Sequence, residues 1–192
     1  MNAPSLKTDR LLLRGLKPED APRVQLLAGD REIADTTLTI PHPLEAEMAE
    51  QYVEGKISLY EGGKGVCFAV ILAAEDVLVG VVTLKNIDHT HKNAEVGYWI
   101  GKDYWHNGYA TEAALAVVNY GLEELNLQRI YAHCLSRNPL SGKVLAKIGM
   151  THEGTLRQHI LKWNEFEDID LYGILRSEHR LGDRQPQVSI KK

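Results

Sequence analysis

The chain has 192 residues, of which 44% are hydrophobic and 25% are charged, proportions typical of one folded domain with a single core. A net charge of -4 with scattered Lys and Arg excludes the basic face that nucleic acid needs, so no nucleic-acid partner is expected. Cys67 and Cys134 lie in apolar runs and are expected to be buried and reduced. No segment resembles a signal peptide or a membrane span, so a cytoplasmic protein without membrane contact is expected.

The first half of the chain alternates between helical and β-forming patterns. The predicted elements are a strand (residues 10–16), a helix (18–29), an irregular segment (30–44), a helix ended by Gly62, Gly63 and Gly65, a hairpin of two strands (66–72 and 78–84) and a third strand (94–100).

The second half continues with the clearest helix of the chain. Its predicted elements are a helix (108–125), a strand (129–135), a short helix (139–148) and two strands (150–156 and 166–175). The order predicts an α/β fold, with a mixed, mostly antiparallel twisted sheet of about seven strands and helices on both faces. Residues 1–176 are expected to form one domain and residues 177–192 a polar tail.

The loop at residues 105–112 (WHNGYATE) joins a predicted strand to the long helix. A helix N-terminus presents unpaired N–H groups and a partial positive charge, so it suits a pyrophosphate. Gly108 lets the backbone approach such a ligand, and Ala110 keeps the first turn slim. An ordinary Asn–Gly turn explains this loop equally well.

A second segment, residues 137–150 (RNPLSGKVLAKIGM), places Asn138 where a strand ends and a helix begins. Its amide is able to bridge a pantetheine arm, and a simple helix cap is the alternative.

Glu95 is the candidate general base. Strand alternation puts Glu95, Gly97 and Trp99 on one face of their strand, so the carboxylate lies beside a position without a side chain. A Glu in so apolar a strand is unfavourable unless it is solvated, paired or functional. The alternative is a structural carboxylate at the wet end of the strand.

Metal chemistry has little support in the sequence. His89 and His91 lie in a polar hairpin, and no third ligand follows at a recognisable spacing. No metal is therefore expected.

Taken together, the segments EVGYWIGKDYWHNGYATEA, RNPLSGKVLAKIGM, HEGTLRQ and DIDLYGIL resemble the GNAT superfamily of N-acetyltransferases, in its RimJ/RimL-like branch. The resemblance covers most of residues 8–176. It implies that acetyl-CoA is the co-substrate and that the strands at 94–100 and 129–135 splay apart to admit the pantetheine arm.

The resemblance also implies roles for individual residues. Glu95 draws the amine proton, Asn138 contacts the pantetheine, and the backbone of Ile100 pairs with it. Trp105 stands where the family signature has Gln or Arg, and the loop N–H groups hold the pyrophosphate: His106, Asn107, Gly108, Tyr109, Ala110 and Thr111. Leu145 occupies the position of a catalytic Tyr found in many relatives, and Ser141 offers a hydroxyl that is a proton donor, a helix cap or a CoA contact.

The predicted function is transfer of an acetyl group to a primary amine, either an α-amino group of a protein or peptide or a small amino-acid-like amine. A non-catalytic acyl-CoA sensor or scaffold is the alternative. A homodimer is compatible with the sequence, which does not fix the oligomeric state.

Overall fold

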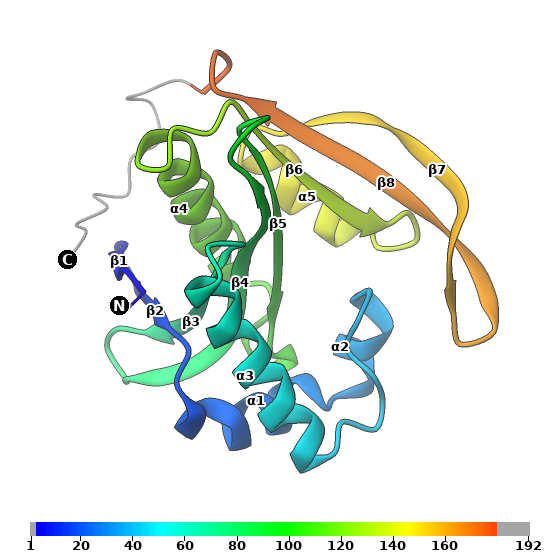
Figure 1. The fold of residues 1–192 in the computed structure, drawn as a ribbon. Coiled ribbons are helices and arrows are strands. Elements are labelled where there is room, and N and C mark those ends of the chain that lie inside the picture. The colour runs from blue at the N-terminus through cyan, green and yellow to red at the C-terminus, as the bar shows by residue number, and fades with distance from the viewer. Residues whose placement is uncertain (1–2, 180–192) are drawn as a thin grey trace.

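The computed structural model describes residues 3–179, which fold around one eight-stranded sheet with the strand order β1-β2-β3-β4-β5-β6-β8-β7 (Figure 1). The strands are β1 (Leu6–Lys7), β2 (Leu11–Gly15), β3 (Val66–Leu72), β4 (Val77–Asp88), β5 (Asn93–Ile100), β6 (Arg129–Leu135), β7 (Thr151–Lys162) and β8 (Glu165–Leu175). The helices are α1 (Ala21–Ala28), α2 (Arg31–Thr36), α3 (Ala46–Glu61), α4 (Tyr109–Glu123) and α5 (Pro139–Lys147), with 3-10 turns at Pro18–Asp20 and Lys102–Tyr104.

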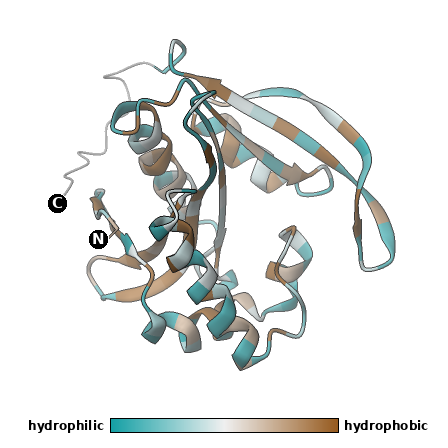
Figure 2. Cartoon of the chain, viewed as in Figure 1, coloured by the Kyte–Doolittle hydropathy of each residue, from teal (hydrophilic) through white to brown (hydrophobic). Residues whose placement is uncertain are grey.

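The predicted fold class is confirmed, because the sheet is mixed and mostly antiparallel and helices cover both of its faces. Alternation along β3 shows how the sequence builds two cores. Phe68 and Val70 pack on the face covered by α4, whereas Cys67 and Ala69 pack on the face covered by α1 and α3. With both faces covered, all seven residues of β3 are buried, and Figure 2 shows the corresponding hydrophobic run.

Three details differ from the sequence prediction. The sheet has eight strands instead of about seven, because Leu6 and Lys7 pair with β2. Residues 30–44 are not wholly irregular, since they contain α2, whose N-terminus is capped by the Asp30 carboxylate accepting from the Glu32 N–H at 2.9 Å. β7 runs to Lys162, well beyond the predicted end at residue 156.

The predicted tail begins with ordered residues. Ser177 and Glu178 continue a turn after β8, and His179 Nε2 lies 3.1 Å from Glu123 Oε1. Residues 180–192 lie outside the described residues.

The central strands β5 and β6 form the only parallel pair among the described strands, and they pair over three positions. The last pair is Glu95 with Tyr131, after which the strands diverge (Figure 1). The predicted splay of this strand pair is therefore present, and Glu95 stands at the point where it opens.

The long hairpin of β7 and β8 arches away from the rest of the sheet (Figure 1). Its turn uses Trp163 and Asn164, whose φ angles of 49° and 71° match the left-handed pair of a tight hairpin turn. The hairpin is tied back to α2 by Lys162, whose Nζ donates to the Thr37 carbonyl oxygen at 2.8 Å.

Candidate functional site

The N-terminus of α4 is open. Gly108 is its cap residue, with a φ of 80°, and no side chain caps the helix. The N–H groups of Tyr109, Ala110 and Thr111 lie in the first turn, where a helix supplies no acceptor of its own. This end of the helix therefore presents donors and a positive partial charge to an anion.

The loop before α4 is braced from the start of β2. Arg10 donates from Nη1 to the Asn107 carbonyl oxygen at 2.9 Å and from Nε to Glu112 Oε2 at 2.7 Å. Burial alone would raise the pKa of Glu112, but hydrogen bonds from Thr8 and Arg10 outweigh it and lower that pKa. Glu112 thus stays ionised and holds Arg10 against the loop.

Trp105 and Asn107 support the loop from within. The Trp105 indole donates to the Ile100 carbonyl oxygen at 2.6 Å, which fixes the loop to the end of β5. The Asn107 amide donates to the carbonyl oxygens of Tyr104 and Trp105, at 3.2 and 3.0 Å, and this side chain does not line the cleft.

The backbone of Ile100 is directed into the gap between β5 and β6. The Gly101 N–H donates to the Val79 carbonyl oxygen, so Ile100 and Gly80 are a non-hydrogen-bonded pair of the antiparallel ladder. The backbone groups of Ile100 therefore face away from β4, toward the side where β6 has diverged.

A first chamber, here called the α4 chamber, lies along this gap. It has an empty volume of about 1240 Å³, including space open to solvent. Its lining includes all of the predicted cofactor-binding residues except Asn107: Ile100, Trp105, His106, Gly108, Tyr109, Ala110, Thr111, Asn138 and Ser141. Lys143 and Lys147 of α5 also line it, and both were missed by sequence reasoning although they lie one helical turn apart on one face.

A second chamber, here called the Glu95 chamber, continues from the first and has an empty volume of about 800 Å³. Thr36, Thr37, Tyr98, Trp99 and Ser141 line both chambers, so the two form one continuous cleft.

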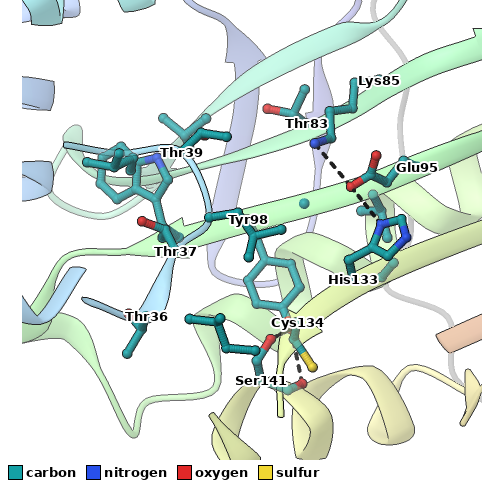
Figure 3. Close-up of a pocket in the computed structure, with 18 of the residues that line it drawn as sticks. Thr36, Thr37, Thr39, Thr83, Lys85, Glu95, Tyr98, His133, Cys134 and Ser141 are labelled. Atoms are coloured by element: carbon teal, nitrogen blue, oxygen red, sulfur yellow. Dashed lines mark hydrogen bonds and ion pairs between the residues drawn. The ribbon is translucent and has the colours of Figure 1, made fainter. Parts of the chain in front are cut away.

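Glu95 is only 7% exposed, and its carboxylate has three partners, of which Figure 3 shows Lys85 and His133. Lys85 Nζ lies 3.0 Å and His133 Nδ1 3.2 Å from Oε1, and the Asn86 amide donates to Oε2 at 3.0 Å. A carboxylate has about four acceptor sites, so Oε2 retains the capacity for another donor. Gly97 leaves space beside it, because a Cβ added there would meet nothing within 4 Å.

Tyr98 and Ser141 meet where the two chambers join (Figure 3). The Tyr98 hydroxyl lies 3.1 Å from Ser141 Oγ and 3.2 Å from the Ser141 carbonyl oxygen. Burial raises the pKa of Tyr98, so its phenol stays protonated at neutral pH.

Asn138 has both ends of its amide engaged. Its Oδ1 accepts from the Ser141 N–H at 3.3 Å, as in a helix cap, and its Nδ2 donates to the Thr36 carbonyl oxygen at 3.3 Å. An amide has two N–H donors and two acceptor lone pairs, so Asn138 keeps one donor and one acceptor site for a further contact.

Across residues 3–179, no group of three or more His, Cys, Asp or Glu side chains is arranged to hold a metal ion. None of the described helices is long and apolar enough to cross a bilayer.

Comparison with known proteins identifies the family of this chain. The family model of the acetyltransferase (GNAT) domain matches residues 10–151. The chain belongs to the GNAT acetyltransferase family. It is 34% identical over 175 residues to YnaD, an uncharacterized N-acetyltransferase of Bacillus subtilis, covering 90% of this chain and 98% of the relative. A GNAT-family acetyltransferase structure from Bacillus anthracis is 32% identical, with a TM-score of 0.80 over 90% of this chain and 99% of that one.

Further relatives are similar over most of the GNAT chain, and the first of them supports the RimJ/RimL-like branch. The ribosomal-protein-serine acetyltransferase of Escherichia coli is 27% identical over 152 residues, which is 79% of this chain and 84% of the relative. The spermidine N(1)-acetyltransferase of Vibrio cholerae is 25% identical over 170 residues, which is 88% of this chain and 95% of the relative. The prediction of an acetyl-CoA-dependent N-acetyltransferase is thereby confirmed, and the sensor or scaffold alternative loses its support.

Several residues of the GNAT cleft were absent from the predicted site. Lys85 lies opposite Glu95 in the β4–β5 register. Pairing the two strands residue by residue in the sequence would therefore have placed Lys85 beside Glu95. Asn86 and His133 come from β4 and β6, and Tyr98 reaches Ser141 across the gap. No pattern of neighbouring residues in the sequence indicates those contacts.

Proposed function

We propose that this GNAT enzyme transfers the acetyl group of acetyl-CoA directly to an α-amino group, of a peptide N-terminus or of a small amino-acid-like amine, with Glu95 as general base. The observation that carries the proposal is a buried carboxylate at the fork of β5 and β6, beside open space, in a chamber continuous with the α4 chamber.

The α4 chamber fits the donor. Its open helix N-terminus suits the pyrophosphate, and Lys143 adds a cationic side chain on the opposite wall. Bound acetyl-CoA supplies a thioester carbonyl, and the N–H of Ile100 faces the gap where a developing oxyanion needs a donor. Trp105 acts by holding the end of β5 in place.

Glu95 receives the proton of the attacking amine. Lys85, Asn86 and His133 hold its carboxylate in a fixed orientation, and Oε2 retains acceptor capacity for the incoming N–H or for a bridging water. A covalent enzyme intermediate is unnecessary. The cysteine of this chamber, Cys134, has its pKa raised by burial to about 11, so little nucleophilic thiolate exists at neutral pH.

An α-amino group suits this base better than a lysine side chain. Its reference pKa of about 7.7–8.0 lies well below the value of about 10.4 for Lys, so its deprotonation near pH 7 is easier. We place the enzyme in the cytoplasm, where acetyl-CoA is available, and a homodimer stays a prediction.

The acceptor is tested with a peptide that has both a free N-terminus and an internal Lys. We expect fragmentation mass spectrometry to place the acetyl group on the N-terminal nitrogen. Acetylation confined to the Lys side chain would contradict the preference. Activity on small amines without any peptide product would retain the transferase and reject the peptide substrate.

Ser141 is proposed as the donor of a proton to the leaving CoA thiolate, oriented by Tyr98. The thiol of CoA has a reference pKa near 8.5, so the donor helps without being essential, and Ser141→Ala should lower kcat only about tenfold at pH 7. The decrease should vanish by pH 9, where the thiolate leaves unprotonated.

Ser136→Ala is the matched control, because the Ser136 hydroxyl donates to Asp170 at 2.8 Å and lines neither chamber. If kcat of Ser141→Ala matched that of this control at pH 7, Ser141 would be a helix-cap and lining residue only.

A further inference from the structure

The Glu95 chamber contains an ammonium group that the proposed chemistry leaves unused. Lys56 of α3 lines this chamber together with Lys85. Its Nζ lies 5.2 Å from the centroid of the Tyr52 ring, which the Trp99 indole fixes by donating to the Tyr52 hydroxyl at 3.1 Å. Within residues 3–179, Lys56 has no hydrogen bond to a side chain and no ion pair.

The Glu95 chamber is lined by more lysines than carboxylates. Glu95 is the one carboxylate among the described lining residues, and its Oε1 already lies 3.0 Å from Lys85. Burial, together with the charge of Lys85, favours the neutral form of Lys56 and lowers its pKa. An anion beside Lys56 would stabilise the charged form of its side chain.

The anion is not supplied by the protein or by the donor. Two carboxylates of β8 are engaged elsewhere, since Glu167 binds Arg137 at 2.7 Å and Asp170 accepts from Ser136 and Thr155, and no residue of β8 lines the Glu95 chamber. The phosphates of the donor belong with the open end of α4, and Lys56 does not line the α4 chamber. The acceptor is the molecule left to provide it.

We propose that Lys56 binds an anionic group of the acceptor, so that this enzyme selects amines with a carboxylate or phosphate close to the amino group. This inference rests on the proposed function and specifies its substrate class. Glu95 takes the amine end of such a molecule, Lys56 takes the anionic end, and the space at Gly97 lies in the same chamber. A second ammonium in the acceptor would meet two lysines, so polyamines are rejected.

The test compares each anionic acceptor with a neutral partner, and adds a polyamine. CoA release at saturating acetyl-CoA is measured with amino acids and their α-amides, with peptides that begin with Asp or Asn, with O-phosphoethanolamine and ethanolamine, and with spermidine. For the wild type we expect kcat/KM to be about tenfold or more higher for at least one anionic amine than for its neutral partner, and spermidine to be the poorest acceptor. The three kinds of anionic acceptor show whether the group that Lys56 binds is an α-carboxylate, an acidic side chain or a phosphate.

Variants connect the preference to Lys56. Lys56→Met should raise KM for the anionic acceptor about tenfold or more, leave the neutral acceptor unchanged and leave the CoA-induced rise in Tm intact. Lys56→Arg should keep the preference. Lys64→Met is the matched control, because it removes an exposed lysine just beyond α3 that lines neither chamber.

Three results would overturn the inference. They are equal kcat/KM for acids and amides in the wild type, an unchanged preference in Lys56→Met, and spermidine as the best acceptor. In the first two cases acetylation of α-amino groups would persist, so only the assignment of Lys56 fails. Spermidine as the best acceptor would also contradict the preference for an α-amino group. If no amine in the panel released CoA, the proposed function would fail and the inference with it.

Discussion

Glu95→Gln should lower kcat by roughly 10²-fold or more while CoA binding is retained, because the amide cannot accept the amine proton. The substitution keeps the size of the side chain, and the α4 chamber does not include Glu95. Turnover of the variant should recover partly as the pH rises, since a larger fraction of the amine is then already neutral. Steady-state kinetics between pH 6.5 and 9.5, with CoA binding measured by calorimetry, check both expectations.

The control for Glu95→Gln is Glu153→Gln. Glu153 is also a paired carboxylate, held by Arg129 at 2.6 Å, but it lines neither chamber. Its kcat should equal that of the wild type. Equal kcat for Glu95→Gln and the wild type at pH 7 would remove Glu95 from the mechanism and leave it as the partner of Lys85.

Gly108→Val should abolish the rise in Tm that CoA produces in the wild type. A ligand that binds only the folded state stabilises it by about 2.7 kcal/mol at 100 times its Kd, so the wild-type shift should be several degrees. Gly108 has a φ of 80°, which a β-branched residue adopts only with strain, and its side chain would project at the open end of α4. Thermal unfolding with and without millimolar CoA gives the comparison.

A second glycine variant separates the effect of backbone strain from the loss of CoA binding. Gly63 has a φ of 64° and a Cβ there would meet nothing within 4 Å, so Gly63→Val introduces similar strain away from the cleft. Both variants should have a lower Tm without ligand, and only Gly63→Val should respond to CoA. A full CoA response in Gly108→Val would show that the pyrophosphate binds elsewhere, and no response in the wild type would argue against acetyl-CoA as donor.

Local patterns were sufficient for much of the fold. Alternation in β5 placed Ala94 and Val96 in one core and Trp99 in the other, as the structure has them. The open end of α4 followed from Gly108 and the helical spacing after it. These features depend on neighbours within a few residues, which is the range over which a sequence pattern carries information.

Features that depend on contacts distant in sequence could not be predicted. The extended β7 and the helix α2 are joined through Lys162 and Thr37, which are 125 positions apart. The residues around Glu95 come from three strands, and the three-position pairing of β5 with β6 decides which of them converge. The sequence placed the Asn138 amide where a strand ends, but it gave no sign of the two partners of this amide in the folded chain.

The short stretch from Asp35 to Thr37 is held by bonds from two places, the connection between β6 and α5 and the end of β7. Arg137 binds the Asp35 carboxylate at 2.9 Å, Asn138 donates to the Thr36 carbonyl oxygen, and Lys162 donates to that of Thr37. Thr36 and Thr37 also line both chambers. A ligand in one chamber that moves this stretch therefore changes the wall of the other chamber, where the second ligand binds. Any such coupling is reciprocal: the factor by which the donor alters acceptor affinity must equal the factor by which the acceptor alters donor affinity.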